Sequence, residues 1–460
     1  MHISSLSDFQ RPFFIGIAGT GMSALAQYLQ GCGKQVSGSD RYFTPGTPNE
    51  TRTRLEAEGI RCFEQDGSGI TDATELVVVS TAVEDTVAEV VKAKQLNIPI
   101  IKRAELLALI ARSKKTIAVG GTSGKSTTSA MLFEILHHAG LQPGIISGAG
   151  LTRIIRQGKI GNAWVGGGDW LVIEADESDG SIVLYEPEIG LLLNIDKDHK
   201  EVDALLDIFR RFRANTRSVF SVNRSHPLAA TLSANAAYDF ATTPGTGAAY
   251  EATDFEQHQL TICFRINGVP FLLQQMGRHN MENALAAAAV AHQVGVPLAT
   301  AAAALQQYEG IYRRHQVLGQ KNGVWVIDDY AHNPAKCAAS IAACQPLAQK
   351  VVAWFQPHGF APTRFLKDDF IQQIAAVLRP HDEIWMSEIF YAGGTTSKDI
   401  SANDLVEGIK AKGKQAHFVA NRNDLLPALR PHLQPGTVLL LMGARDPSLG
   451  NFARQVWQQL

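Results

Sequence analysis

Residues 116–128 have the sequence TIAVGGTSGKSTT, an apolar strand-like run, a glycine-rich turn, and then Lys125 and Ser126 opening a helical pattern. Glycines let backbone N–H groups point at phosphate oxygens, and a helix N-terminus adds a favourable field for an anion. Lys125 can reach the β- and γ-phosphates, and Ser126 can bind Mg²⁺. The strict Walker spacing is not met, since its first glycine would fall at Val119. The segment predicts a variant nucleoside triphosphate site; the alternative is a glycine-rich turn beside a solvated lysine.

Acidic side chains follow a later apolar run. The stretch WLVIEADESDGS carries Glu174, Asp176, Glu177 and Asp179 at or just past the end of a predicted strand. Strand ends of a parallel sheet lie beside such a phosphate loop, where Mg²⁺ would supply the counter-charge that these carboxylates need. The alternative is a solvated acidic turn.

The next apolar run, IGLLLNIDKDH, brings Asn194, Asp196 and His199 to the same predicted edge of the sheet. A lone histidine is more often structural than functional. Its place at a strand end beside carboxylates favours a metal or phosphate role for His199.

Strand-like and helical patterns alternate along the whole chain, which is typical of parallel α/β sheets. We predict an α/β protein of three domains: a Rossmann-like domain at residues 1–112, a central P-loop ATPase-like domain with a mixed sheet at 113–311, and a C-terminal Rossmann-like domain at 312–460. Strands flanking Asn267-Gly268 predict a hairpin, which we expect at the edge of the central sheet.

The composition narrows the function. The 460 residues are 45% hydrophobic and 19% charged, and 42 Lys plus Arg against 44 Asp plus Glu leave a net charge of −2. This near-neutral charge gives no indication of a basic surface that would bind nucleic acid or an anionic membrane. The most apolar stretch, 284–304, predicts a packed helix and no membrane span. Five cysteines without a CxxC pair favour reduced, structural thiols in a cytoplasmic protein.

A second glycine pattern lies near the N-terminus. Gly16-x-x-Gly19-x-Gly21 follows a predicted strand and opens a helix, and Asp40 lies about 20 residues on, where a ribose-binding acid belongs in a dinucleotide fold. The order GxxGxG is not the dinucleotide order GxGxxG, so the pattern argues only weakly for a redox cofactor. A glycine turn without a ligand is the alternative.

GTSGKST, EADESDGS and NIDKDH, in this order and spacing, resemble the Mur ligase family, the ATP-dependent amide-forming enzymes of bacterial cell-wall precursor synthesis. The resemblance covers the whole chain. GIAGTGMSALA, SGSD, GRHNMENALAA, the Arg313-Arg314 pair, DDYAHNP and FQPHGFAPTRFLKDDF are similar to the branch that joins L-alanine to UDP-N-acetylmuramate.

The resemblance implies the roles of individual residues. ATP phosphates would be held by Lys125 and its loop, a first Mg²⁺ by Ser126 and Glu174, and a second by His199. Apart from the resemblance, Arg313 and His332 are both candidates to stabilise the tetrahedral intermediate, and the sequence does not rank them. The residues implied in ATP binding are Gly121, Thr122, Ser123, Gly124, Lys125, Ser126, Thr127, His279, Asn280, Asn283, Arg313 and Asp329. Those implied in sugar-nucleotide binding are Gly19, Thr20, Gly21, Met22, Asp40, Ser80 and Thr81.

Two departures from the family pattern concern the amino acid. Gly359 stands after QPH where this branch has an arginine, so Arg364 becomes the expected partner of the α-carboxylate, with Lys398 as the alternative. Arg445 and Asp446 also stand where the family has small residues. We expect a monomer or homodimer.

Two alternative functions stay open at this point. A recycling ligase would attach a whole tripeptide to the same sugar nucleotide, although EADESDGS favours the alanine branch over that enzyme's EADEYD. A P-loop nucleotide-binding protein would have no ligase activity.

The chain has no lysine between Lys200 and Lys321, and Arg213 lies where later Mur ligases carry a carbamylated lysine. Activity should therefore not depend on bicarbonate.

Overall fold

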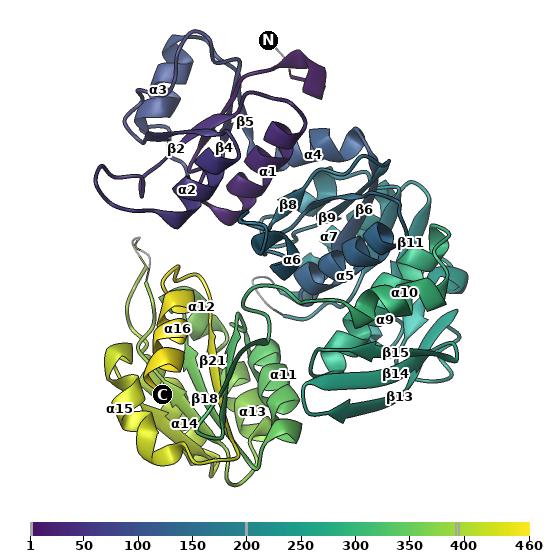
Figure 1. The fold of residues 1–460 in the computed structure, drawn as a ribbon, viewed down its shortest axis with the longest axis vertical. Helices are drawn as coiled ribbons and strands as arrows, with labels where there is room; N and C mark the ends of the chain where they lie inside the picture. Colours follow the sequence, from purple (N-terminus) through teal and green to yellow (C-terminus); the bar gives the residue numbers. More distant parts are fainter. Residues whose placement is uncertain (1–2, 198–200, 392, 394–395) are drawn as a thin grey trace. The chain divides into compact units, whose positions relative to one another are not determined.

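The computed structural model describes residues 3–197, 201–391, 393 and 396–460. The first sheet contains five short parallel strands in the order β3-β2-β1-β4-β5 (Figure 1). Its elements are β1 (Pro12–Ile15), α1 (Thr20–Gly31), β2 (Ser37–Asp40), α2 (Glu50–Ala57), β3 (Arg61–Glu64), β4 (Leu76–Val79), α3 (Ala88–Gln95), β5 (Ile100–Lys102) and α4 (Arg103–Arg112). The strand order reverses between β1 and β4, where ligands bind in open α/β sheets.

The second sheet has the order β11-β10-β6-β9-β7-β8, with β6 between two parallel neighbours and only the pair β7–β8 antiparallel among its described pairings. This is the predicted mixed sheet. Its elements are β6 (Lys115–Gly120), α5 (Lys125–His138), β7 (Gly144–Ile146), α6 (Thr152–Ile155), β8 (Ala163–Trp164), β9 (Trp170–Glu174), β10 (Ile189–Leu192), α7 (Val202–Asn215), β11 (Val219–Val222) and α8 (Pro227–Ala230).

The strands around Asn267-Gly268 form a separate sheet, β12-β13-β14-β15, so their expected place at the edge of the central sheet is wrong. The hairpin itself is confirmed, because Asn267 (φ 47°) and Gly268 (φ 81°) are both left-handed, as a two-residue turn requires. The elements are β12 (Phe240–Ala241), β13 (Tyr250–His258), β14 (Thr261–Ile266) and β15 (Val269–Leu273).

The alanine-rich stretch forms two helices, α9 (Arg278–Gln293) and α10 (Leu298–Gln306), and not one. The break falls at Gly295, whose φ of 95° ends the first helix, and at Pro297, which precedes the second. Among the described residues, no helix combines the length and apolar character that crossing a membrane would require.

The C-terminal sheet has the order β16-β17-β21-β18-β19-β20, parallel except for β16–β17. Its elements are β16 (Gln316–Lys321), β17 (Val324–Asp329), α11 (Pro334–Cys344), β18 (Lys350–Gln356), α12 (Phe360–Phe365), α13 (Lys367–Val377), β19 (Glu383–Met386), α14 (Ala402–Ala411), β20 (Gln415–Phe418), α15 (Leu425–Leu429), β21 (Thr437–Gly443) and α16 (Leu449–Gln459). Short 3₁₀ helices lie at Leu6–Asp8, Ser181–Leu184, Ala236–Tyr238, Gln345–Leu347, Arg422–Asp424 and Arg430–His432. The predicted three-domain α/β class is confirmed.

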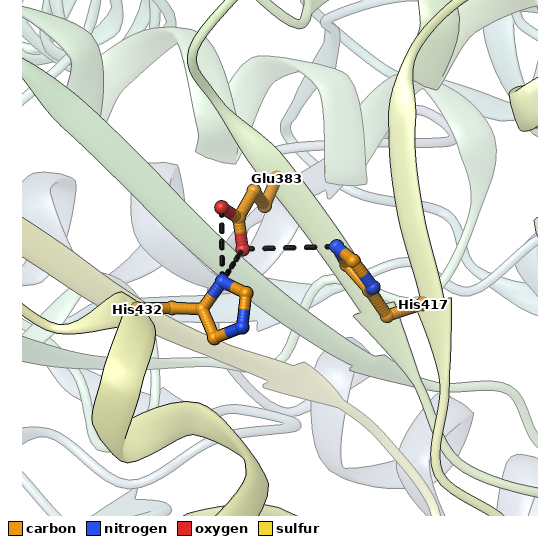
Figure 2. A group of neighbouring side chains, drawn as sticks. All are labelled: Glu383, His417 and His432. Carbon is orange, nitrogen blue, oxygen red and sulfur yellow. Dashed lines mark hydrogen bonds and ion pairs between the residues drawn. The ribbon is translucent and has the colours of Figure 1, made fainter.

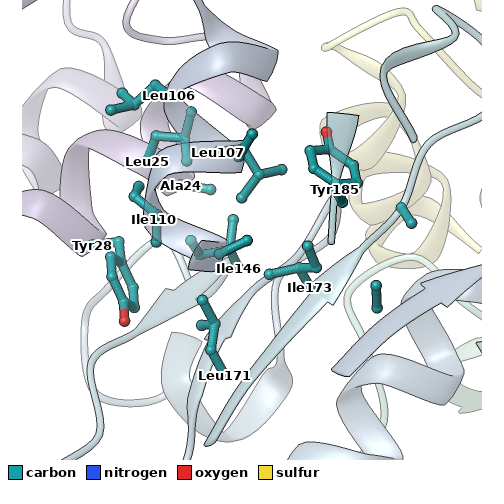
Figure 3. Close-up of a cluster of buried hydrophobic side chains, with 14 of the residues drawn as sticks. Ala24, Leu25, Tyr28, Leu106, Leu107, Ile110, Ile146, Leu171, Ile173 and Tyr185 are labelled. Atoms are coloured by element: carbon teal, nitrogen blue, oxygen red, sulfur yellow. The ribbon is translucent and has the colours of Figure 1, made fainter. Parts of the chain in front are cut away.

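The chain forms two compact units, and the first joins the first two sheets. It comprises Met1–Thr253, Ile266–Val269 and Asn283–Ile311; the second comprises Asp254–Arg265, Pro270–Glu282 and Tyr312–Leu460. Figure 3 shows why the first two sheets stay together: side chains of α1 and α4 pack on strands β7 and β9 in one apolar cluster. Burial of this cluster stabilises the first unit.

Candidate active site

The phosphate loop follows the buried strand β6, as predicted. Gly121 (φ 134°) and Gly124 (φ 86°) have backbone angles that other residues rarely adopt. A Cβ at Gly124 would also lie 2.4 Å from Asn283 Oδ1. Asn283 accepts a hydrogen bond from Thr128 Oγ1 at 3.2 Å, so α9 brings this predicted nucleotide residue against the loop. Thr127 lies half-buried in the first turn of α5.

Lys125 is buried against carboxylates. Its Nζ donates to Glu177 Oε2 at 2.6 Å and to the carbonyl of Gly121 at 2.7 Å, and 15% of its side chain is exposed. Burial alone would lower the pKa of Lys125, but Glu177, Asp176 and Glu174 outweigh it and raise the pKa. The lysine is therefore a permanent positive charge at the loop.

Glu174 ends β9 beside the start of α5. Its Oε2 accepts from Ser126 Oγ at 3.0 Å, and its Oε1 accepts from Ser147 Oγ at 2.7 Å and from the N–H of Gly148 at 2.6 Å. The sequence thus correctly placed Glu174 and Ser126 together. A carboxylate and a hydroxyl oxygen at a phosphate loop form a donor set that fits Mg²⁺, which prefers hard oxygen ligands.

Asn194 and Asp196 hold the loop from the β10 side. Asn194 Oδ1 accepts from Thr122 Oγ1 at 2.9 Å and from the N–H of Ser123 at 2.8 Å. His226 Nε2 lies 3.2 Å from Asp196 Oδ1. The sequence did not predict this contact, because 30 residues separate the two side chains. The predicted metal residue His199 lies outside the described residues.

The N-terminal glycine loop is held by Asp40. The carboxylate of Asp40 accepts from the N–H groups of Ala18 at 2.9 Å and Tyr42 at 3.0 Å. Gly16 has a φ of 76°, and residues 19–22 lie at the start of α1. Ser80 and Thr81 directly follow β4, the neighbour of β1 at the reversal of strand order. These predicted sugar-nucleotide residues therefore lie at the place where this fold binds ligands.

Arg103, which the sequence did not single out, lies beside this loop. A Cβ on Gly21 would meet Arg103 Cδ at 3.1 Å, and Arg103 Nη2 donates to Asp179 Oδ2 at 2.9 Å. Asp179, like Glu177, is thus paired with a cation within the first unit.

In the second unit, Arg313 is buried and braced. Its Nε donates to both oxygens of Asp328, at 3.1 and 2.9 Å, and its Nη2 donates to the carbonyl of Gly443 at 3.0 Å. Its φ is 56°, a left-handed angle at a non-glycine residue. Burial raises the pKa of Asp328, opposed by Arg313.

Asp329 and His279 belong to one buried cluster of the second unit. Ser340 Oγ donates to Asp329 Oδ2 at 2.6 Å, and His315 Nδ1 lies 3.5 Å from the same oxygen. The rings of His279 and His315 have centroids 4.9 Å apart. Burial, with His315 adding to it, lowers the pKa of His279 to about 3, so its ring is neutral. Asn280 Nδ2 donates to the carbonyl of Met276 at 2.7 Å.

His332 is also neutral at physiological pH, because burial and then Lys336 lower its pKa well below 6.5. Its Nδ1 lies 2.9 Å from the carbonyl oxygen of Tyr330. A carbonyl only accepts, so Nδ1 carries the proton and Nε2 carries the lone pair. This tautomer makes His332 a hydrogen-bond acceptor toward a substrate, whereas stabilisation of an oxyanion would need a donor.

The segment after QPH explains the absent arginine. Gly359 is the N-cap residue before α12 (Phe360–Phe365), and its φ of 72° disfavours any side chain. Arg364 Nη2 donates to Asp399 Oδ1 and, at 3.1 Å, to the carbonyl of Ser397. Its side chain is 42% exposed. Lys398 Nζ lies 5.2 Å from the ring centroid of Tyr391.

The unusual Asp446 has a structural partner. Arg422 Nη1 donates to Asp446 Oδ2 at 2.5 Å and to Gln356 Oε1 at 3.1 Å, while Nη2 donates to Ser448 Oγ. Asp446 is buried, whereas Arg445 is exposed with a φ of 67°. The pair therefore fixes the turn after β21 through Asp446.

Fold and site together define an ATP-dependent ligase built from three α/β domains. Residues 13–115 match the description "Mur ligase family, catalytic domain", residues 119–291 match "Mur ligase middle domain", and residues 313–445 match "Mur ligase, glutamate ligase domain". The chain belongs to the Mur ligase family, as its motifs indicated.

Similar proteins span nearly the whole chain. It is 36% identical over 471 residues to the UDP-N-acetylmuramate–L-alanine ligase of Xylella fastidiosa (strain 9a5c), covering 97% of this chain and 95% of that protein. The ligase of the same name from Gloeobacter violaceus is 32% identical over 451 residues, with 96% and 95% covered. The structure of the Thermotoga maritima UDP-N-acetylmuramate-alanine ligase superposes with a TM-score of 0.79 at 26% identity, covering 98% and 99%. A murein peptide ligase from Psychrobacter arcticus shares the fold, with a TM-score of 0.68 at 22% identity over 98% of each chain.

Proposed function

We propose that the protein joins L-alanine to the lactyl carboxylate of UDP-N-acetylmuramate, in an ATP-dependent step of peptidoglycan precursor synthesis. The observation that carries this function is the phosphate loop, in which Lys125 pairs with Glu177 and Ser126 with Glu174. The near-full-length relatives of the chain carry that activity in their names. We place the reaction in the cytoplasm and connect it to cell shape and division, which depend on the wall. Monomer and homodimer both fit the proposal.

Activation of the carboxylate is the first step, because its oxygen is a poor leaving group. The lactyl carboxylate oxygen attacks the γ-phosphorus of ATP, ADP leaves, and an acyl phosphate forms. Lys125 stabilises the charge on the transferring phosphoryl oxygens. Ser126 and Glu174 would hold a Mg²⁺ ion, which supplies further positive charge to the phosphates; His199 is the proposed residue for a second ion.

Amide formation follows when the amine of alanine attacks the acyl carbon and phosphate leaves. The amine nitrogen becomes acidic as the C–N bond forms, and a nearby acceptor must take its proton. His332 Nε2 has the free lone pair for this role, since Nδ1 is held by Tyr330. Arg313 is the remaining candidate for stabilising the tetrahedral intermediate, and Arg364 for holding the alanine carboxylate.

The substrates divide among the predicted domains. We propose that residues 1–112 hold the sugar nucleotide, residues 113–311 hold ATP, and residues 312–460 hold the amino acid. In the first, Asp40 fixes the glycine loop and leaves Ser80, Thr81 and the start of α1 facing the ligand region. Asp329 of the last domain and His279 of the central domain are also proposed as ATP-binding residues.

The test is phosphate release measured with every combination of substrates. Phosphate should appear only when ATP, UDP-N-acetylmuramate and L-alanine are all present. A requirement for the murein tripeptide in place of free alanine would favour the recycling ligase. ATP hydrolysis that ignores both other substrates would contradict ligation altogether.

A further inference from the structure

A second cluster of ionisable side chains lies at the other end of the C-terminal sheet, where strands β18, β19 and β20 begin. Glu383 is the first residue of β19, His417 belongs to β20, and His432 follows α15 (Figure 2). Trp385 and His417 are cross-strand partners, and Glu383 lies two residues before Trp385. Because side chains alternate along a strand, Glu383, Trp385 and His417 share one face of the sheet.

The three side chains point toward one another (Figure 2). Glu383 Oε2 lies 2.9 Å from His432 Nδ1 and 3.9 Å from His417 Nε2, and all three ligand atoms lie within 4.8 Å of one another. Zinc bound tetrahedrally, with ligands at about 2.0–2.1 Å, needs ligand atoms roughly 3.4 Å apart. Small side-chain rotations therefore bring the three atoms around one ion.

One nitrogen of the cluster has no hydrogen-bond partner in the part of the chain that the structure describes. His417 Nε2 is buried as an atom yet accepts and donates no hydrogen bond among the described residues. The ring stacks on Trp385 with centroids 4.2 Å apart, which fixes its direction. Leaving a buried polar atom without a hydrogen bond destabilises the fold, and a bound ligand would offset that cost.

The other neighbours of Glu383 allow an ion to bind. Lys350 Nζ lies 2.5 Å from Oε1, and Trp385 Nε1 donates to Oε2 at 3.0 Å. Lys350 thus occupies the other oxygen and balances the carboxylate when no ion is present. The side chains of His417 and His432 are 36% and 32% exposed, so the cluster lies close to the solvent.

We propose that Glu383, His417 and His432 form a binding site for Zn²⁺, with one coordination position left for water. Two imidazoles and a carboxylate suit zinc, whereas Mg²⁺ prefers oxygen ligands alone. The proposed ligands come from β19, β20 and the segment before β21. They lie toward the amino ends of the strands, whereas Gln356 and Gly443 lie at the carboxyl ends of β18 and β21. Its binding is separate from the ligase reaction.

Calorimetric titration of the chelator-treated full-length protein with ZnCl₂, in millimolar Mg²⁺, tests the site. The wild type should bind one more equivalent of Zn²⁺ than the His417→Ala/His432→Ala double variant. His381→Ala is the matched control, because this exposed histidine lies two residues before Glu383 and outside the cluster. It should bind as the wild type does.

Thermal unfolding gives a second readout. Zn²⁺ should raise the unfolding temperature of the wild type and of His381→Ala but not that of the double variant, since binding stabilises only the folded site. If the double variant does not fold, judged by circular dichroism, His417→Asn alone serves, with affinity expected to fall at least tenfold. Equal zinc stoichiometry in wild type and folded variant, or an equal loss in His381→Ala, would overturn the proposal.

Discussion

The phosphate loop and the segment after QPH both carry predicted substrate-binding cations, but the two regions hold them differently. Lys125 is largely buried, with 15% of its side chain exposed, and it is bonded to a carboxylate that is itself buried. Arg364 pairs with Asp399 at the surface, where both side chains stay largely exposed. A buried pair loses several kcal/mol when one partner is removed, whereas an exposed pair contributes about 0–1 kcal/mol.

The two environments suit two functions: Lys125 suits phosphoryl transfer, and Arg364 suits recognition of the amino acid. Phosphoryl transfer uses charges fixed before the substrate arrives, since preorganised groups need no rearrangement during reaction. The amino acid side needs a cation that can leave Asp399 for a substrate carboxylate at small cost.

Removing the buried cation should have the largest effect. Lys125→Ala should lower kcat by at least about a hundredfold, because the charge on the transferring phosphoryl group loses its fixed partner. Steady-state phosphate release measures this. Lys115 is an exposed lysine at the start of β6, the strand before the loop, so Lys115→Ala should change kcat less than twofold. Near-normal turnover in folded Lys125→Ala would remove the phosphate-loop assignment.

Burial should matter in the second unit as well, through His279. Its folded pKa of about 3 is below the unfolded value of about 6.5, so the unfolded state binds a proton first as pH falls. The stability tied to the neutral ring is present above about pH 6.5 and is lost as pH falls toward 3. Urea unfolding should show wild-type stability falling relative to His279→Gln by about 1.4 kcal/mol per pH unit below about pH 6. Parallel pH profiles would show that this histidine is not held neutral.

The carboxylate at the loop should control the metal requirement. Glu174→Gln keeps the shape but loses the charge, so the Mg²⁺ concentration for half-maximal rate should rise about tenfold. The exposed Glu186→Gln is the control and should leave the titration unchanged. If both variants titrate as the wild type does, Glu174 only braces Ser147 and Gly148.

The exposed cation should give a smaller and more selective effect. Arg364→Ala should raise KM for L-alanine about fivefold, consistent with one exposed charge-assisted contact, and leave KM for ATP and the sugar nucleotide nearly unchanged. Asp399→Asn frees Arg364 and should not raise KM for alanine. A rise in Lys398→Ala with none in Arg364→Ala would place the carboxylate contact on Lys398.

Added bicarbonate is expected to have no effect on the reaction rate. Activity should not depend on added bicarbonate at low pH, because no lysine lies between Lys200 and Lys321 and the guanidinium of Arg213 is not carbamylated in the same way. Rates in degassed and bicarbonate-supplemented buffer should agree within error. Strong recovery by bicarbonate would mean that a lysine elsewhere supplies the ligand.

The sequence predicted the buried parallel strands well, because they are continuous apolar runs such as those of β6, β9 and β10. It missed β3 (RCFE), β16 and β20, which lie at sheet edges and mix polar with apolar residues. It also misplaced the hairpin sheet, since local turn chemistry predicts a hairpin but not which sheet the hairpin joins.

Site residues on one motif were predictable, and those brought together by the fold were not. Lys125, Ser126 and Glu174 lie at strand ends whose proximity follows from parallel topology. The pairing of Lys125 with Glu177, and of Arg364 with Asp399, depends on side-chain packing. His417 and His432 lie 34 and 49 residues after Glu383, so no local spacing could reveal that cluster.

The central claim is that the sugar carboxylate is activated as an acyl phosphate on this chain, and the fate of one oxygen atom tests it. UDP-N-acetylmuramate labelled with ¹⁸O in both lactyl carboxylate oxygens is converted with ATP and L-alanine in unlabelled water, and the released phosphate is examined by mass spectrometry. Attack of the carboxylate on the γ-phosphorus predicts one ¹⁸O in each phosphate, with the other kept in the amide. Amide product accompanied by unlabelled phosphate would contradict the account.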